Sequence, residues 1–214
     1  MQEPKIQEVD DIEAVPVEEQ NVVFKPNVGP QTEFLAAGER EVLYGGSAGG
    51  GKSYAMLADP LRYMGHPSFS GLLLRHTTEE LRELIFKSKE IYPQIWKGIK
   101  WSERKMQWEA PSGARLWMSY LDRDDDVLRY QGLAFSWIGF DELTQWSTPY
   151  AWNYMRSRLR SVAQDLPVYM RATTNPGGPG HQWVKKMLLT LHHTEDNLMP
   201  QILNQGMFLP IQKD

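Results

Sequence analysis

The sequence is constrained most strongly by a glycine-rich octapeptide, GSAGGGKS, at residues 46–53. It fits the pattern G-x-x-x-x-G-K-[ST] of a phosphate-binding loop (Walker A), in which glycines let backbone N–H groups turn toward phosphate oxygens. The residues before it, Glu41–Tyr44, predict a short strand, and the stretch from Lys52 to about Met64 has apolar side chains at helical spacing. This order of strand, loop and helix is the context that the motif requires, so we predict a nucleotide-binding site here.

Each part of the loop has an expected role. The phosphate contacts are expected from Gly46, Ser47, Ala48, Gly49, Gly50, Gly51, Lys52 and Ser53. Lys52 would reach the β- and γ-phosphates of ATP and act in catalysis, while the Ser53 hydroxyl would ligate Mg²⁺. The alternative is a plain glycine-rich connection between two elements, and the flanking strand and helix argue against it.

Predicted strands and helices alternate along the rest of the chain. Strands are predicted at 71–75 (GLLLR), 135–140 (FSWIGF) and 167–173 (PVYMRAT). Helices are predicted from about residue 78 to Tyr92, just before Pro93, and over 148–160. Residues 104–121 instead alternate around Pro111-Ser112-Gly113, which indicates an antiparallel hairpin.

This alternation predicts an α/β fold. With the phosphate-binding loop, we expect a P-loop NTPase of the RecA-like (ASCE) type. Its central sheet would be mainly parallel and flanked by helices, with the antiparallel hairpin added.

Two acids, Asp141 and Glu142, directly follow the apolar strand at 135–140. A parallel strand delivers such residues to the carboxyl edge of the sheet, where the phosphate-binding loop also lies. We expect Asp141 to hold Mg²⁺ through water and Glu142 to polarise the attacking water as general base. Solvated acids at a strand end are the plainer interpretation. The loop upstream and the pairing of the two acids favour hydrolysis.

The next strand ends in TTNPGG, at residues 173–178. Polar side chains at the tip of a neighbouring strand, here Thr173, Thr174 and Asn175, are placed to sense the γ-phosphate and relay its loss to the following loop. An ordinary glycine-proline turn explains the same residues equally well.

Taken together, the motifs resemble the large terminase subunit of tailed bacteriophages, specifically its N-terminal ATPase domain. The resemblance rests on Pro30-Gln31, YGGSAGGGKS, LLLR, RYQG, WIGFDELTQW, RSRLRS and TTNPGG, which occur in consistent order over about residues 24–190. It implies an ATPase that drives double-stranded DNA into the procapsid.

The resemblance also assigns roles by position. Gln31 matches the adenine-contacting glutamine of the family, although a plain loop residue is as good an interpretation. Asp141 and Glu142 match its metal-binding and catalytic acids, and residues 173–175 its coupling motif. Arg75, at the end of its strand, would line the nucleotide site or form a surface salt bridge.

An arginine finger is harder to assign, because the phosphate-binding loop itself contains no arginine. Arg129, just before the YQG step, is our first candidate for a finger inserted into a neighbouring subunit's site. Other candidates are Arg156, Arg158 and Arg160. An exposed helix face is the alternative for each of these side chains.

Charge and composition suggest how the chain is divided. Residues 1–23 carry seven acidic side chains and one lysine, although the net charge of the whole chain is only −4. We expect a disordered acidic tail at 1–23, the P-loop ATPase domain at 24–190, and a C-terminal extension or the start of a lid or linker at 191–214. Full-length relatives carry a nuclease domain, and we expect neither that domain nor its activity here.

We therefore expect an ATP-hydrolysing DNA-packaging motor domain that uses ATP and Mg²⁺. Its partners would be double-stranded DNA, a homo-oligomeric ring on the capsid portal and, as an option, the small terminase subunit, with no membrane. The chain has no cysteine and no long apolar run, so we expect a soluble intracellular protein. The resemblance implies that its compartment is the host cytoplasm. Two alternatives remain: a helicase or other RecA-like DNA-dependent ATPase, and a non-hydrolysing nucleotide-binding assembly module.

Overall fold

The structure is a computed structural model that describes residues 22–46, 49–191 and 208–210 of the 214-residue chain. Its helices are α1 (Pro30–Ala36), α2 (Lys52–Ala58), α3 (Thr78–Ile95), α4 (Tyr150–Arg156) and α5 (His181–Leu191), with 3-10 helices η1 (Asp59–Tyr63), η2 (Asp124–Tyr130) and η3 (Leu143–Gln145). Its strands are β1 (Glu41–Gly45), β2 (Ser70–Arg75), β3 (Lys100–Ser102), β4 (Gln107–Glu109), β5 (Arg115–Tyr120), β6 (Trp137–Phe140), β7 (Tyr169–Thr174) and β8 (Phe208–Pro210). Within the described ranges, no helix is both long and apolar enough to cross a bilayer.

The strands form one sheet in the order β3-β4-β5-β2-β6-β7-β1-β8. The five central strands, from β5 to β1, pair in parallel. The pairs β3–β4, β4–β5 and β1–β8 are antiparallel. This confirms the predicted α/β fold with a mainly parallel sheet and an added hairpin.

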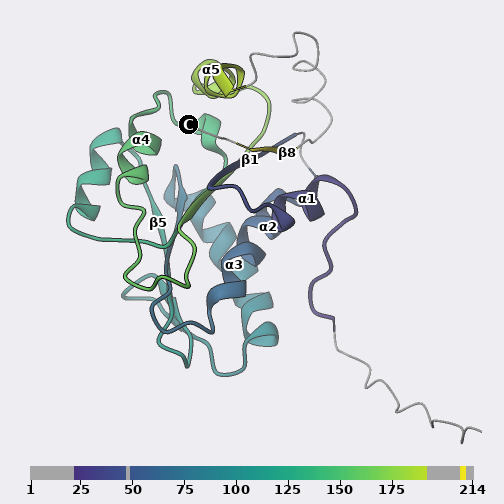
Figure 1. The fold of residues 1–214 in the computed structure, drawn as a ribbon, viewed down its shortest axis with the longest axis vertical. Helices are drawn as coiled ribbons and strands as arrows, with labels where there is room; N and C mark the ends of the chain where they lie inside the picture. Colours follow the sequence, from purple (N-terminus) through teal and green to yellow (C-terminus); the bar gives the residue numbers. More distant parts are fainter. Residues whose placement is uncertain (1–21, 47–48, 192–207, 211–214) are drawn as a thin grey trace, which may run out of the picture.

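Helices cover both faces of the sheet, as Figure 1 shows, with α1, α2 and α3 on one side and α4 on the other. Because side chains alternate along a strand, each central strand contributes to both layers. In β2, Leu73 packs into the layer of α2 and α3, whereas Leu72 and Leu74 pack into that of α4 and α5. All three leucines are fully buried, which explains the continuous apolar run at 71–75.

The predicted site residues that follow or end strands gather at one edge, because these strands are neighbours and run in parallel. The phosphate-binding loop follows β1, Asp141-Glu142 follows β6, Thr173–Asn175 ends β7 and continues beyond it, and Arg75 ends β2. The carboxyl edge of a parallel sheet is where open α/β folds bind their ligands.

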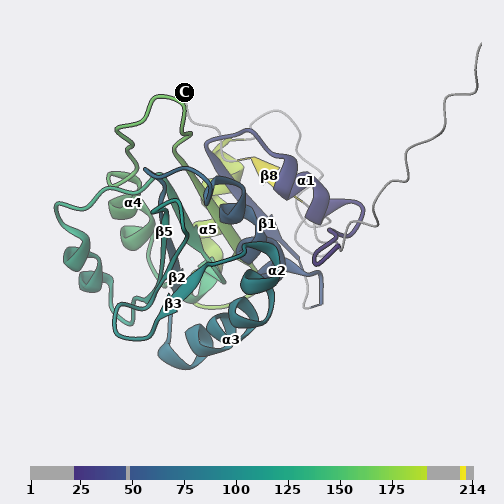
Figure 2. The ribbon, with the colours of Figure 1, turned by 90° about the horizontal axis from the view of Figure 1, so that it is seen from below.

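Strand β8 pairs antiparallel with β1, which carries the phosphate-binding loop. It comes from residues 208–210, inside the segment 191–214 for which a lid or linker was one expectation. Figure 2 shows β8 beside α1, on the side of β1 away from the hairpin. The acidic segment expected to be a tail lies outside the described residues up to position 21.

Two predicted helices differ from the structure where prolines occur. The helix from Lys52 does not run unbroken to Met64: α2 ends at Ala58 and the chain tightens into η1, which contains Pro60. Proline lacks the N–H that a further α-helical turn needs. In contrast, α3 continues through Pro93 to Ile95, so the predicted end at Tyr92 is wrong.

Tertiary contacts explain why α3 tolerates its proline. Tyr92 is fully buried and donates its hydroxyl to the Leu57 carbonyl at 2.8 Å. The Trp96 N–H donates to the Tyr92 carbonyl at 2.9 Å and completes the last turn. Packing therefore fixes the helix end one turn beyond the position that the proline predicts.

Helix α4 is shorter than the predicted 148–160, because the chain leaves it to form a bridge between Leu159 and Phe135, two residues before β6. The Phe135 N–H donates to the Arg158 carbonyl at 3.0 Å, and the Arg160 N–H donates to the Phe135 carbonyl at 3.0 Å. This bridge extends the buried run before β6 by a contact that local periodicity does not reveal.

Candidate nucleotide-binding site

The loop between β1 and α2 is held by side chains that bind its carbonyl oxygens. Lys52 Nζ donates to the Gly46 carbonyl at 2.9 Å, and the Tyr44 hydroxyl donates to the Gly50 carbonyl at 2.6 Å. Ser47 and Ala48, both predicted phosphate contacts, lie outside the described residues. With these carbonyls occupied, the N–H groups of the loop remain the natural donors to an anion.

Gln31 on α1 binds the same loop from behind. Its Nε2 donates to the Gly51 carbonyl at 2.9 Å, and its Oε1 accepts the Asn27 N–H at 2.6 Å. Only 3% of Gln31 is exposed, and both hydrogen bonds of its side-chain amide are made to the backbone. Gly51 has φ +73°, and a Cβ there would lie 2.6 Å from Gln31 Nε2, so this position requires glycine.

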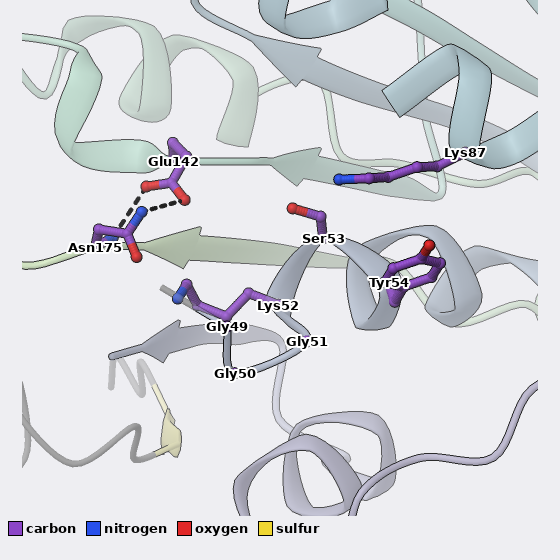
Figure 3. Close-up of a pocket in the computed structure, with 9 residues that line it drawn as sticks. All are labelled: Gly49, Gly50, Gly51, Lys52, Ser53, Tyr54, Lys87, Glu142 and Asn175. Carbon is purple, nitrogen blue, oxygen red and sulfur yellow. Dashed lines mark hydrogen bonds between the residues drawn. The ribbon is translucent and has the colours of Figure 1, made fainter. Parts of the chain in front are cut away.

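A pocket opens in front of the loop, as Figure 3 shows. It is lined by Gly49, Gly50, Gly51, Lys52, Ser53, Tyr54, Lys87, Glu142 and Asn175. The structure thus brings the described part of the phosphate-binding loop together with one predicted catalytic acid and one predicted coupling residue.

Asp141 lies behind the pocket and is fully buried. Its Oδ2 pairs with Arg75 Nε at 3.2 Å, and its Oδ1 accepts a hydrogen bond from the Thr173 hydroxyl. Arg75 does not line the pocket, which was one expectation. It is also only 7% exposed, so its salt bridge is buried and not at the surface, as the other expectation had it. Instead, Arg75 neutralises the charge of a buried carboxylate.

Glu142 has a left-handed backbone, with φ 62° and ψ 56°, which a non-glycine residue rarely adopts. Its N–H donates to the Thr173 hydroxyl oxygen at 3.0 Å. Its carboxylate accepts two hydrogen bonds from Asn175, one from the backbone N–H at 3.0 Å and one from Nδ2 at 2.8 Å. Strain of this kind is commonly found at functional positions.

Burial and neighbouring charges shift two pKa values in the pocket. The pKa of Glu142 is raised, chiefly by burial and then by the charge of Asp141, against the opposing effects of Arg75, the Asn175 N–H and Lys52. Burial lowers the pKa of Lys52, and the two acids partly offset this. A carboxyl group whose pKa is raised toward neutrality suits general-base chemistry.

The loop after Glu142 connects the site to α5. The Thr174 hydroxyl donates to the Thr144 hydroxyl at 2.8 Å. The Thr144 carbonyl accepts the Gly180 N–H at 2.8 Å, and the Trp146 carbonyl accepts Trp183 Nε1 at 2.7 Å. These hydrogen bonds connect the tip of β7, through Thr144 and Trp146, to the start of α5. A displacement of the tip would therefore displace the start of α5.

The donors present fit a nucleotide-bound Mg²⁺. This ion typically takes one or two protein oxygens and completes its shell with phosphate and water. Ser53 lines the pocket, and Asp141 Oδ2 accepts no hydrogen bond, although Arg75 Nε is ion-paired with it at 3.2 Å. In the part of the chain that the structure describes, no cluster of three or more His, Cys, Asp or Glu side chains occurs, so that part offers no all-protein cage.

The candidate arginine fingers lie outside the pocket lining. Arg129 pairs with Asp126 at 2.6 Å and lies over the Tyr120 ring. Arg156 pairs with the buried Glu41 at 2.6 Å, which joins α4 to β1. Arg158 lies over the Tyr154 ring, and Arg160 donates to the Leu133 carbonyl.

Sequence reasoning missed two residues of the pocket, Tyr54 and Lys87. Lys87 lies on α3, one helical turn after Glu83, with which it pairs at 2.6 Å. In a sequence, an acid and a lysine at this spacing predict only a solvent-exposed pair on a helix face. Its place in the pocket follows from how α3 packs beside α2.

Solved structures of large terminases share this fold. The ATPase domain of the Thermus phage P74-26 large terminase matches with a TM-score of 0.58 and 14% identity, over 86% of this chain and 77% of that one. The large terminase of another phage, described as a thermophilic bacteriophage, matches with a TM-score of 0.58 and 18% identity, over 76% of this chain and 42% of that one. The HK97 bacteriophage large terminase matches with a TM-score of 0.54 and 12% identity, over 75% of this chain and 36% of that one.

These likenesses concern the fold, and the match spans less than half of the thermophilic bacteriophage's large terminase. No curated protein sequence matches significantly. The family model described as phage terminase large subunit matches residues 38–203, well over half of the chain. That range includes the phosphate-binding loop, the paired acids and the TTNPGG segment. The chain therefore belongs to the phage terminase large subunit family.

Proposed function

We propose that the described fold hydrolyses ATP and serves as the motor domain that drives double-stranded DNA into a procapsid. The observation that carries the proposal is the geometry of Glu142. Its carboxylate is held in the pocket beside Lys52 and Ser53, and its pKa is raised by burial. A module that only binds nucleotide has no need of such a base.

Each residue of the pocket has a part in this reaction. Lys52 binds the β- and γ-phosphates, with the backbone of residues 46–53 around them. Glu142 accepts a proton from the attacking water as the water adds to the γ-phosphorus and ADP leaves. Thr173, Thr174 and Asn175 couple the loss of the γ-phosphate to movement of the loop that leads to α5.

ATP is the proposed substrate and Mg²⁺ its companion ion. The large terminase of the thermophilic bacteriophage has been solved in complex with ADP, which supports an adenine nucleotide here. Ser53 would ligate the ion and Asp141 would hold it through water, and the ion would neutralise charge on the β- and γ-phosphates. The Gln31 side chain already makes two hydrogen bonds, one through Nε2 and one through Oε1. We therefore propose that it contacts adenine through the second N–H of Nε2 and the second lone pair of Oε1.

The assembly is proposed from the family. A homo-oligomeric ring on the capsid portal would allow Arg129 to enter a neighbouring subunit's site, after its exposed pairing with Asp126 is exchanged. The small terminase subunit and DNA are the other proposed partners, in the host cytoplasm. Residues 24–190 would form the ATPase domain, with the acidic tail before it and the extension after it, and with cutting of DNA left to other chains or segments.

ATP turnover per subunit, measured against protein concentration with Lys52→Ala as the blank, tests this function. Turnover that depends on Lys52 and rises with concentration is expected of a site completed between subunits. Turnover that depends on Lys52 but not on concentration would leave the ATPase intact and contradict the arginine in trans. Bound ATP without turnover at any concentration would favour the non-hydrolysing assembly module.

A further inference from the structure

Lys87 enters the nucleotide pocket from α3, a helix that contributes no other residue to the lining. Figure 3 shows its side chain extended, with the amine pointing into the pocket on the side of the Ser53 hydroxyl. Lys52 approaches from the phosphate-binding loop instead. The pocket therefore presents two lysine side chains that come from different elements.

Two contacts hold Lys87 in this direction. Its Nζ pairs with Glu83 at 2.6 Å, and it lies 5.8 Å from the centre of the Tyr54 ring. Ser53, which is expected to bind Mg²⁺, lines the same pocket as Tyr54 and Lys87, and the Lys87 amine points toward its side of the pocket. The Lys87 side chain keeps 27% of its surface exposed and is therefore open to a ligand.

The pairing with Glu83 is easily exchanged. Glu83 is 61% exposed, and exposed pairs of this spacing on a helix surface contribute little to stability. The pair with Glu83 also joins two full charges, but a terminal phosphate carries up to two negative charges against the one of Glu83 and therefore attracts the ammonium more strongly. A phosphate that arrives in the pocket would therefore draw Lys87 from Glu83 at little cost.

The neighbours of Lys87 indicate which phosphate it would meet. Ser53 is expected to bind the ion that bridges the β- and γ-phosphates, and Glu142 to face the water beside the γ-phosphorus. Both line the pocket together with Lys87, whereas Gln31, the expected adenine contact, does not. Lys87 thus shares its pocket with the residues that are expected around the γ-phosphate.

We propose that Lys87 is a second phosphate-binding lysine that contacts a γ-phosphate oxygen and so distinguishes ATP from ADP. The inference rests on the proposed function, because it requires that the pocket bind ATP. Lys87 adds a cation from the strand-helix unit β2–α3, independent of the phosphate-binding loop and of any arginine from a neighbouring subunit.

The test compares Lys87→Gln with Lys89→Gln. Lys89 lies on the same helix but pairs with Glu103 outside the pocket, which makes it a matched control. Binding of Mg²⁺ complexes of a non-hydrolysable ATP analogue and of ADP would be measured by titration calorimetry. We expect Lys87→Gln to weaken binding of the ATP analogue by about tenfold or more while ADP binding changes less than about twofold, because a hydrogen bond to a charged group is lost.

One further variant, Lys87→Arg, and the control Lys89→Gln keep the result interpretable. Lys87→Arg retains the charge and should restore most of the preference for the ATP analogue, and Lys89→Gln should bind both nucleotides like the wild type. Equal weakening of both nucleotides by Lys87→Gln, or no weakening, would overturn the inference.

The proposed function can fail separately. A wild-type protein that binds and hydrolyses ATP, with a Lys87→Gln variant of unchanged preference, would contradict the inference alone. A wild-type protein that binds neither nucleotide would contradict both.

Discussion

Asn175 holds both carboxylate oxygens of Glu142, through its backbone N–H at 3.0 Å and its Nδ2 at 2.8 Å. The residue expected to sense the γ-phosphate is therefore bonded directly to the residue expected to activate water. Thr173 links the same two strands a second time, through the Glu142 N–H and the carboxylate of Asp141. The two acids that follow β6 are thus positioned by the tip of β7, so a movement of the tip must be accompanied by a movement of the acids.

The raised pKa of Glu142 predicts the pH dependence of turnover. A base must be deprotonated, and burial makes Glu142 take up its proton at a higher pH than an ordinary glutamate, whose pKa is 4.5. As the pH falls, kcat should therefore decline through an acid limb that lies above 4.5. The measurement is kcat against pH at saturating ATP, with circular dichroism at each pH to show that the fold persists. An acid limb at or below the ordinary value would contradict the burial of the base.

Gly51→Ala should destabilise the protein by about 1–3 kcal/mol, because alanine is strained at φ +73° and its Cβ would collide with Gln31. Urea unfolding measures the loss. Gly49→Ala is the control, since its φ of +89° imposes backbone strain while no atom lies within 4 Å of the added Cβ.

The collision itself is tested by combining Gly51→Ala with Gln31→Ala. The double variant should lose less free energy of unfolding than the sum of the single changes, because the shortened side chain removes the clash. Additive losses, or a Gly51→Ala variant no less stable than Gly49→Ala, would show that Gln31 does not pack against the loop as described.

Gly180→Ala should detach the start of α5 from η3, because its Cβ would lie 2.1 Å from the Trp146 carbonyl oxygen. Overpacking of this kind costs about 1–3 kcal/mol. Thermal unfolding should show the loss, with Gly38→Ala as the control, since nothing lies within 4 Å of a Cβ at that position. Equal stability of the two variants would mean that α5 and η3 can move apart to make room for the added Cβ without a loss of stability, which would contradict the close contact described.

The fold and the centre of the site were predictable because their signals are local. The octapeptide 46–53, the acids after β6 and the residues that end β7 each combine a buried strand with the chemistry that follows it. Strands buried on both faces are continuous apolar runs, and their alternation with helices dictates a parallel sheet. Neighbouring parallel strands then bring these segments to one edge.

Contacts between distant segments were not predictable. The pairing of Arg75 with Asp141 joins the ends of β2 and β6, and neither residue signals the other in the sequence. Arg171 donates from β7 to the Ala37 carbonyl at 2.7 Å while almost fully buried, where an arginine would ordinarily be expected at the surface. The course of α3 past Pro93 likewise depends on packing of Tyr92.

The central claim, that Glu142 is the general base of an ATPase, is tested most directly by the turnover of Glu142→Gln. We predict a loss of about 10²–10⁴-fold, the usual contribution of a general base, with ATP still bound. Glu79→Gln, at an exposed position of α3, is the control and should retain wild-type turnover. Unchanged turnover in Glu142→Gln, with ATP bound as tightly as in the wild type, would contradict the account.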